Sequence, residues 1–293
     1  MGRIGMAPCC AGSQRFAARG VALIAVLWIV ASLSVLATGL TRSIRDEARM
    51  MSLSRQSVQA QALGDGAIQV ALQALLANNQ PVSQAVQSQV VYRGVSMQVE
   101  VIPLNGYIDI NAAPAPLLER LFAVAGGLPS AAAQAAAQAV ITVRDTPDAR
   151  GGRQRFEAEE DLLRVPGIDY DLYARLAGLL TADLRGSGRV NPMAAPPEVL
   201  QVLTGGNAGA AAQIASRRAA GQVGVDTSSI DGSLTDVSAV RQFRVQARVP
   251  MGDGSMVRVA RNVALDARVP DGAPWHTFRI LRSVEPVQRA TTP

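Results

Sequence analysis

The pattern of apolar and polar residues separates the first part of the chain from the rest. A short leader, 1–20, carries three arginines and no acid, and the following segment 21–40 (VALIAVLWIVASLSVLATGL) has no charged residue. As a helix rising 1.5 Å per residue, this segment spans about 30 Å, the thickness of the hydrocarbon core of a bilayer. The pattern therefore predicts one N-terminal membrane-spanning helix over 21–40.

The segment 41–78 is expected to continue the same helix. It contains no proline, is rich in helix-forming residues, and repeats apolar residues at helical spacings. The apolar positions are Ile44, Met51, Val58, Leu63, Ile68, Leu72 and Leu75. Asn78, Asn79 and Pro81 then end the helix. The alternative is a separate amphipathic helix that follows the span.

Strand-like alternation occupies both ends of the remaining chain. In 79–110, apolar residues alternate after a turn signal at Gly94, and Asn105-Gly106 is typical of a hairpin. In 239–293, two alternating strands flank a turn-rich connection, and HTFRIL (276–281) forms a last short strand. These patterns predict an antiparallel sheet built from both ends of this part of the chain.

The region 111–238 between the strands reads as helical and contains an internal repeat. Residues 113–121 align with 195–203 at a shift of 82, and each copy has Ala-Pro before a leucine-rich helix start. Proline is well tolerated there, since the first N–H groups of a helix have no partner. Between the copies, the acids of 157–161 favour a helix N-terminus, VPGI (165–168) forms a tight turn, and a second helix follows. This is a helix–hairpin–helix pattern.

The predicted fold class is therefore α+β. A long N-terminal transmembrane helix continues onto an antiparallel sheet, and a large helical domain of helix–hairpin–helix or SAM-like type is inserted between the strands.

The charge and the positions of the cysteines argue against nucleic-acid binding and against cysteine-based chemistry. The net charge is +5 and every basic residue is Arg. Taking the three leader arginines from the 28 basic residues leaves 25 against 23 acids, which gives little reason to expect nucleic-acid binding. Both cysteines, Cys9 and Cys10, lie in the leader. A chain without its leader has no disulfide, thiolate nucleophile or cysteine-ligated metal.

The N-terminal segment is open to three interpretations. A secretory signal peptide usually has an apolar core of about 7–15 residues, shorter than this one, although a small-residue cleavage pattern exists near Ala37 and Gly39. An uncleaved anchor is the second interpretation. The third is cleavage after Gly20, before the apolar run, a layout that resembles type IV prepilins and pseudopilins.

This resemblance implies specific roles for residues around the junction. Arg19 and Gly20 would be the processing residues and Val21 the new N-terminus. Most prepilins carry Glu at the fifth mature position, where this chain has Ala25. A carboxylate within a bilayer is costly unless it is paired. In the family the K-type minor pseudopilin lacks this Glu, as expected of a subunit at the end of a fibre.

The order of features over nearly the whole chain resembles type II secretion system protein K, the K-type minor pseudopilin. The resemblance implies a pilin-like fold with the following organisation: prepilin leader 1–20, transmembrane helix 21–40, periplasmic helix 41–78, pilin-like strands 79–110, inserted helical domain 111–238 and C-terminal strands 239–293. The protein is then expected in the bacterial inner membrane, with a single pass and a soluble domain in the periplasm.

The resemblance also implies a function. The protein would cap the tip of the pseudopilus, prime its assembly and support the export of folded proteins across the outer membrane. Its expected partners are the I- and J-type minor pseudopilins, the major pseudopilin, the inner-membrane assembly platform and the prepilin peptidase. The alternatives are a minor pilin of a type IV pilus, against which the helical insert argues, and a membrane-tethered helix–hairpin–helix DNA-binding protein for DNA uptake. Acids around the hairpin, including Asp169, would repel phosphate in the DNA-binding case.

No enzymatic site and no cofactor are expected. The sequence has one His, His276, and no HExxH, GxSxG or phosphate-loop motif. The candidate calcium ligands are Asp145 and Asp148, in the stretch where K-type relatives often carry a calcium site. Calcium takes 6–8 oxygen ligands, and Arg144 and Arg150 flank these two acids. A loop with local ion pairs is the favoured interpretation.

Overall fold

The computed structural model describes residues 15–78, 81–147, 151–152, 154–222, 224–252, 254–265 and 274–285. The chain forms two compact units, Met1–Gln59 and Ala60–Pro293. Helix α1 (Arg15–Asn78) begins in the first unit, and its last part, from Ala60, belongs to the second.

The predicted transmembrane helix, which lies within the first unit, is contradicted by the structure. Within the described part of the chain, no helix combines the length and the apolar character needed to cross a membrane. The membrane span predicted over 21–40 is therefore wrong.

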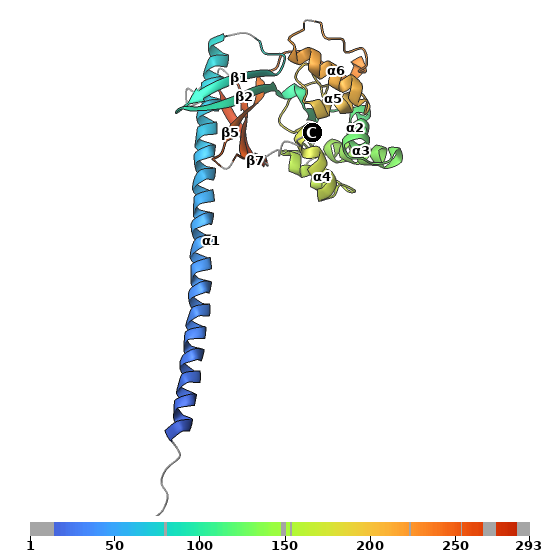
Figure 1. Cartoon of the computed structure of the whole chain (residues 1–293). Helices are drawn as coiled ribbons and strands as arrows, with labels where there is room; N and C mark the ends of the chain where they lie inside the picture. Colours follow the sequence, from blue (N-terminus) through green and yellow to red (C-terminus); the bar gives the residue numbers. More distant parts are fainter. Residues whose placement is uncertain are drawn as a thin grey trace, which may run out of the picture. The chain divides into compact units, whose positions relative to one another are not determined.

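The second unit contains a five-stranded antiparallel sheet in the order β1-β2-β5-β6-β7 (Figure 1). The strands are β1 (Val86–Tyr92), β2 (Val95–Pro103), β5 (Gln242–Pro250), β6 (Met256–Ala264) and β7 (His276–Glu285). Strands from both ends of this part of the chain thus form one sheet, which is consistent with the predicted α+β class.

One face of this sheet packs on the last part of α1. Alternate residues of the strands, such as Val99, Val245 and Val259, are fully buried against Ile68 and Leu72 of the helix. A Cβ at Gly64 would lie 2.7 Å from the Val259 side chain, so a glycine there lets the helix approach the sheet closely. The opposite face of the sheet carries polar residues and borders the helical insertion.

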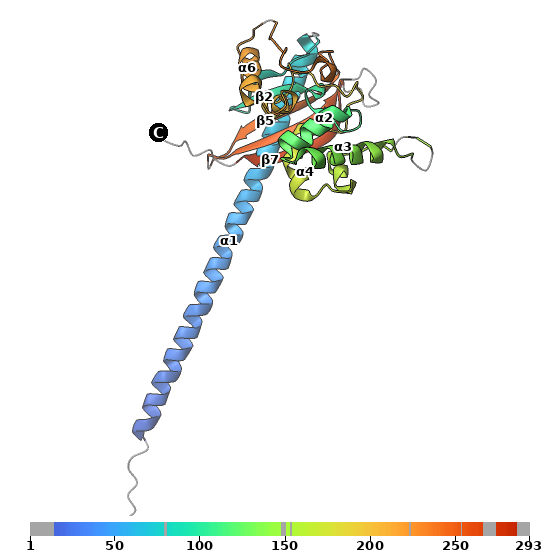
Figure 2. The ribbon, with the colours of Figure 1, turned by 90° about the vertical axis from the view of Figure 1, so that its right-hand side faces the viewer.

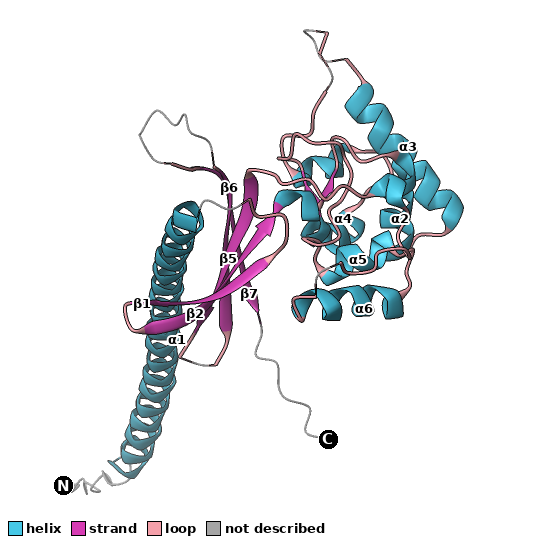
Figure 3. Ribbon diagram, turned by 90° about the horizontal axis from the view of Figure 1, so that it is seen from above, coloured by secondary structure: helices cyan, strands magenta, loops and turns pink. Residues whose placement is uncertain are grey.

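The insertion lies between β2 and β5 in the chain and is largely helical (Figures 2 and 3). It has its own core, made mainly of leucine, valine and alanine side chains. Its elements are η1 (Leu104–Gly106), β3 (Ile108–Asp109), α2 (Ala115–Arg120), η2 (Leu121–Ala125), α3 (Ser130–Asp145), η3 (Glu159–Arg164), α4 (Tyr170–Leu176), η4 (Ala177–Leu179), β4 (Leu180–Thr181), α5 (Pro197–Leu203), α6 (Ala208–Ala219) and η5 (Gly232–Leu234). Strands β3 and β4 pair in parallel as a separate two-stranded sheet.

The hairpin predicted at Asn105-Gly106 is wrong. These residues belong to the 3-10 helix η1, and the following strand β3 pairs with the distant β4. Asn105 is buried, and its side-chain nitrogen donates to the carbonyl of Ser238 at 2.8 Å. A Cβ at Gly106 would lie 2.5 Å from the carbonyl oxygen of Ala194. The Asn-Gly pair therefore takes part in tertiary packing. Its local sequence looks the same as that of a hairpin turn, so the sequence pattern could not separate the two.

The helix–hairpin–helix pattern is present with shorter helices than predicted. The first helix is the 3-10 helix η3, and the second, α4, ends at Leu176. Gly167 turns the chain between them with a φ of +87°, and Asp169 caps α4 by accepting from the backbone N–H of Leu172 at 2.8 Å.

The internal repeat is confirmed in three dimensions. Helices α2 and α5 begin at Ala115 and Pro197, at the shift of 82 found in the sequence. The turn before each helix is also repeated, because Asp109 accepts from the N–H of residue 111 at 2.9 Å and Asn191 accepts from that of residue 193 at 3.0 Å. Asp109, and not the asparagine two residues later, is thus the structural equivalent of Asn191.

In each copy of the repeat, an arginine of the longer second helix binds the turn that precedes the short first helix. Arg144 of α3 donates to the carbonyl of Ala113 at 2.8 Å, and Arg218 of α6 donates to that of Ala195 at 2.6 Å. Both carbonyls lie in the turn that precedes the short helix of the same copy. The insertion therefore contains two related helix pairs, α2 with α3 and α5 with α6.

Candidate functional site at the junction of sheet and insertion

The polar face of the sheet provides half of the candidate site. Along β5, the buried residues Val245 and Ala247 face α1, so the alternating residues Arg244, Gln246 and Arg248 face the opposite side. Strands β6 and β7 place Asn262 and Arg279 directly opposite one another on this polar face. A row of hydrogen-bonding side chains therefore faces the insertion across three neighbouring strands.

Arg279 joins the sheet to two acids of the insertion. Its Nη1 lies 2.7 Å from Oε2 of Glu159, and its Nε lies 2.9 Å from Oδ2 of Asp183. Its Nη2 also donates to Oδ1 of Asp183 at 3.2 Å and to the carbonyl of Glu157 at 3.1 Å. The Asp183 contact is bidentate, the strongest geometry for an arginine–carboxylate pair. One side chain thus holds two segments of the insertion on β7.

Arg244 completes the cluster from the neighbouring strand. Its guanidinium carbon lies 4.1 Å from the centre of the Tyr107 ring, and its Nη2 lies 3.6 Å from Oε1 of Glu159. Its Nε donates to Oδ1 of Asn262 at 3.0 Å, and Nδ2 of Asn262 donates to Asp183 at 3.1 Å. Two arginines and two carboxylates therefore form a charge-balanced, hydrogen-bonded network, hereafter the junction cluster (Arg244, Arg279, Glu159, Asp183 and Asn262).

Burial shifts the ionisation of acids in this region. Burial raises the pKa of Glu159, while Arg279 and Arg244 act in the opposite direction. Burial also raises the pKa of Asp109 to about 6, although the backbone N–H of Asn111 and the charges of Arg155 and Arg144 oppose the shift. The arginines of the junction cluster therefore limit the rise in the pKa of Glu159 that burial causes.

A cavity of about 800 Å³ borders the junction cluster, between the polar face of the sheet and the insertion. Its floor includes Gln246, Arg248 and Arg258 of the sheet, and its walls include Arg175 and Glu198 of the insertion. The lining mixes both signs of charge with backbone and alanine surface. Such a lining suits contact with a polar protein segment better than chemistry on a small molecule.

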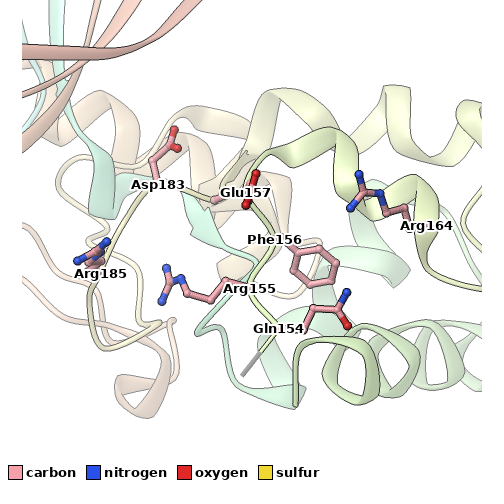
Figure 4. Close-up of a pocket in the computed structure, with 8 residues that line it drawn as sticks. Gln154, Arg155, Phe156, Glu157, Arg164, Asp183 and Arg185 are labelled. Carbon is pink, nitrogen blue, oxygen red and sulfur yellow. The ribbon is translucent and has the colours of Figure 1, made fainter. Parts of the chain in front are cut away.

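A second pocket of about 590 Å³ lies on the insertion itself (Figure 4). In this view, Arg155 and Arg185 lie on the side of Asp183, and Arg164 lies on the other side of the pocket. Arg155 donates to the carbonyl of Leu184 at 3.5 Å, and Asp183 is bound by Arg279. The charged residues of its described lining are thus two acids, Glu157 and Asp183, and three arginines, Arg155, Arg164 and Arg185.

The residues predicted to take part in processing lie in helix α1. Arg19, Gly20 and Val21 are helical, and Ala25 is an exposed helical residue. Their roles in cleavage and assembly stay predictions, because nothing in the structure bears on them.

The calcium candidates are only partly described. Asp145 is the last residue of α3, and Asp148 lies outside the described residues. Among the residues that the structure describes, no group of three or more His, Cys, Asp or Glu side chains is placed to hold a metal ion. Calcium binding at Asp145 and Asp148 therefore stays a prediction.

Replacing Asp109 by asparagine is expected to stabilise the protein at neutral pH. Because the folded-state pKa, about 6, lies above the ordinary value of 3.8, the folded state favours the protonated acid. Stability from this residue is thus complete below pH 3.8 and is lost as the pH rises through 6. The amide of Asp109→Asn would mimic the protonated acid and gain up to about 3 kcal/mol in unfolding free energy at pH 7.5.

Urea unfolding at pH 4 and pH 7.5 checks this expectation. The gain of Asp109→Asn over the wild type should appear at pH 7.5 and vanish near pH 4. Asp226→Asn is the control, since hydrogen bonds from Ser228 lower the pKa of this exposed acid and its replacement should bring no gain. Equal stability of Asp109→Asn and the wild type at pH 7.5 would contradict the argument.

The chain resembles a solved structure in its fold. No protein-family model and no curated protein sequence matches the chain. The structure is similar to a chain in the crystal structure of the GspK-GspI-GspJ complex from the type 2 secretion system of enterotoxigenic Escherichia coli. The similarity has a TM-score of 0.50 at 14% sequence identity and covers 81% of this chain and 99% of that chain. It therefore establishes a shared fold that extends over the whole length of the solved chain.

Proposed function

We propose that this protein is a K-type minor pseudopilin of a type II secretion system. The observation that carries the proposal is the shared fold with a chain of the GspK-GspI-GspJ complex, which extends over 99% of that chain. The arrangement of a helix on an antiparallel sheet, with a helical insertion between β2 and β5, matches the order of features that the sequence analysis assigned to this class.

In this role the protein forms the tip of the pseudopilus with the I- and J-type minor pseudopilins and primes fibre assembly. It supports export of folded proteins across the outer membrane, and its second unit works in the periplasm. The major pseudopilin, the assembly platform and the prepilin peptidase are its further partners, and the peptidase cuts between Gly20 and Val21. N-terminal sequencing of the protein from cells with and without the peptidase tests this cleavage.

The junction cluster supports a capping role through rigidity. A cap that prevents another subunit from stacking must keep its bulk in one place relative to the sheet. Arg279 of β7 and Arg244 of β5 hold Glu159 and Asp183 at hydrogen-bonding or ion-pair distance, and Asn262 of β6 donates to Asp183. The insertion is therefore fixed to three strands of the sheet. The blocking argument is steric and requires no chemistry from the insertion.

The described contacts do not favour the DNA-binding alternative. In each helix pair, the arginine of the second helix donates to backbone carbonyls of its own repeat, as Arg144 does to Ala113 and Arg218 to Ala195. Glu159 and Asp161 lie in the first helix of the hairpin, and Asp169 caps the second. These carboxylates repel phosphate, the main source of affinity for nucleic acid.

Co-expression with the I- and J-type pseudopilins of the same secretion system tests the proposal. We expect the three proteins to co-purify as one complex of defined mass in size-exclusion chromatography with light scattering. We also expect deletion of this protein to stop secretion of the system's substrates. A stable pair of the I- and J-type proteins that excludes this chain, together with normal secretion in the deletion strain, would contradict the proposal.

A further inference from the structure

Asn105-Gly106 is a chemically reactive pair as well as a packing contact. In an open chain, the backbone nitrogen of the glycine attacks the side-chain carbonyl carbon of the asparagine. A bond from this nitrogen to Cγ forms, the bond from Cγ to Nδ2 breaks, and ammonia leaves with the proton of the backbone amide. Water then opens the resulting ring to aspartate or isoaspartate. Glycine favours this reaction because no side chain shields its nitrogen, and Asn105 is the only asparagine in the sequence that precedes a glycine.

The folded structure holds the side chain of Asn105 away from this reaction. Its Nδ2 donates to the carbonyl of Ser238 at 2.8 Å, and its main-chain carbonyl accepts from the N–H of Asn191 at 2.7 Å. Asn105 is only 3% exposed. Ring closure would bring Cγ over the nitrogen of Gly106, and this movement breaks the hydrogen bond to Ser238.

The backbone of Gly106 is fixed by a second contact. A Cβ at this position would lie 2.5 Å from the carbonyl oxygen of Ala194, so the glycine backbone is packed directly against that peptide group. The peptide between Asn105 and Gly106 therefore has little room to rotate and present its nitrogen. The same contact excludes any larger residue at 106, so the fold requires the reactive glycine.

These contacts close the base of the insertion, where the chain enters it from β2 and leaves it for β5. Strand β2 ends at Pro103 and β5 begins at Gln242, so Asn105 and Ser238 lie just inside the two ends. Parts of a folded protein open locally without global unfolding. An opening that separates Asn105 from Ser238 gives the asparagine the freedom that ring closure needs.

The products of the reaction do not fit the closed base. A carboxylate has no N–H to donate to the carbonyl of Ser238, and it places a negative charge against that oxygen. Oδ1 of Asn105 is buried and has no hydrogen-bond partner among the described residues, so no donor there awaits the second carboxylate oxygen. Burial of an unpaired charge is unfavourable, and isoaspartate also adds one carbon to the main chain.

We propose that Asn105 is a deamidation site that the closed base of the insertion protects, and that its conversion to aspartate or isoaspartate opposes closure of the base. The reaction needs only water as co-reactant. Opening of the base is reversible before the reaction and is recorded permanently after it. The inference does not depend on the proposed function.

Peptide mass spectrometry of the full chain in mild detergent at pH 7.5 tests the protection. The conversion of Asn105 should be at least about a hundredfold slower in the folded chain than in urea above the unfolding transition, because only the open fraction reacts. In the denatured chain, Gly106→Ala should slow the reaction, and this comparison requires no folding. Conversion of Asn105 at the same rate in both states would overturn the proposal.

Urea unfolding of Asn105→Asp tests the effect of the product. We expect the equilibrium constant for folding to fall at least about tenfold, since a buried donor is replaced by an unpaired charge. The matched control is Asn207→Asp. Asn207 is an exposed N-cap that accepts from the N–H of Ala210 at 3.0 Å, and aspartate caps a helix equally well. An Asn105→Asp variant as stable as this control would show that the product does not oppose closure.

Discussion

Replacing Arg279 by methionine is expected to lower the free energy of unfolding by about 3–5 kcal/mol, the usual cost of removing one partner from a buried ion pair. The side chains of Glu159 and Asp183 are only 6% and 12% exposed, and Arg279 contacts both. Methionine fills a similar volume without charge, so the loss arises from two carboxylates that keep their burial and lose their main cation. Chemical denaturation at pH 7.5 measures the change.

A second substitution separates charge from packing in this result. Adding Glu159→Gln to Arg279→Met removes one of the uncompensated charges, so the double variant should recover part of the lost stability. Arg164→Met is the control, because the ion pair of Arg164 with Asp161 involves a side chain that is 76% exposed and such pairs contribute about 0–1 kcal/mol. An Arg279→Met variant as stable as Arg164→Met would show that the junction cluster contributes little to stability.

Replacing Gly188 by alanine is expected to destabilise the protein by about 2–5 kcal/mol, since a left-handed backbone and steric overlap add together. Gly188 is buried and has a φ of +74°, and a Cβ there would overlap the carbonyl oxygen of Ala112. At this contact, the turn of the first repeat copy, which contains Ala112, lies against the segment around Gly188 that leads into the second copy. Backbone atoms on both sides leave no flexible side chain to move aside.

Gly205 is the matched control for the left-handed conformation alone. It has a φ of +66°, and a Cβ there would meet no atom within 4 Å. Gly205→Ala should therefore lose only about 1–2 kcal/mol. Thermal or urea unfolding of both variants measures the difference, and equal losses would mean that the Gly188 contact relaxes without cost.

Local sequence patterns predicted the parts of the fold that local physics controls. The Ala-Pro steps marked the starts of α2 and α5, and alternation marked β2 and the strands near the C-terminus. Local patterns fail at Asn105-Gly106. Its hairpin preference is genuine, but the contacts of Asn105 with Ser238 and of Gly106 with Ala194 come from residues far along the chain and decide its conformation.

The junction cluster could not be predicted for a related reason. Arg244 and Arg279 are separated from Glu159 and Asp183 by long stretches of sequence, and each is ordinary in its own segment. Alternating arginines on a strand are typical of a solvated sheet face, and acids near a helix start are typical of capping. Only the return of the chain from the insertion to β5 and β7 brings these four charges together.

The place where the insertion joins the sheet has a consequence for folding. Strands β2 and β5 are antiparallel neighbours, and Pro103 at the end of one pairs with Phe243 near the start of the other. In connectivity the two strands are a hairpin, and 104–241 is its loop. The entropy needed to close a loop rises only slowly with its length, and a loop that has already folded brings its ends together before the strands meet. A folded insertion therefore does for β2 and β5 what the two residues Arg93 and Gly94 do for β1 and β2: it serves as the turn of a hairpin.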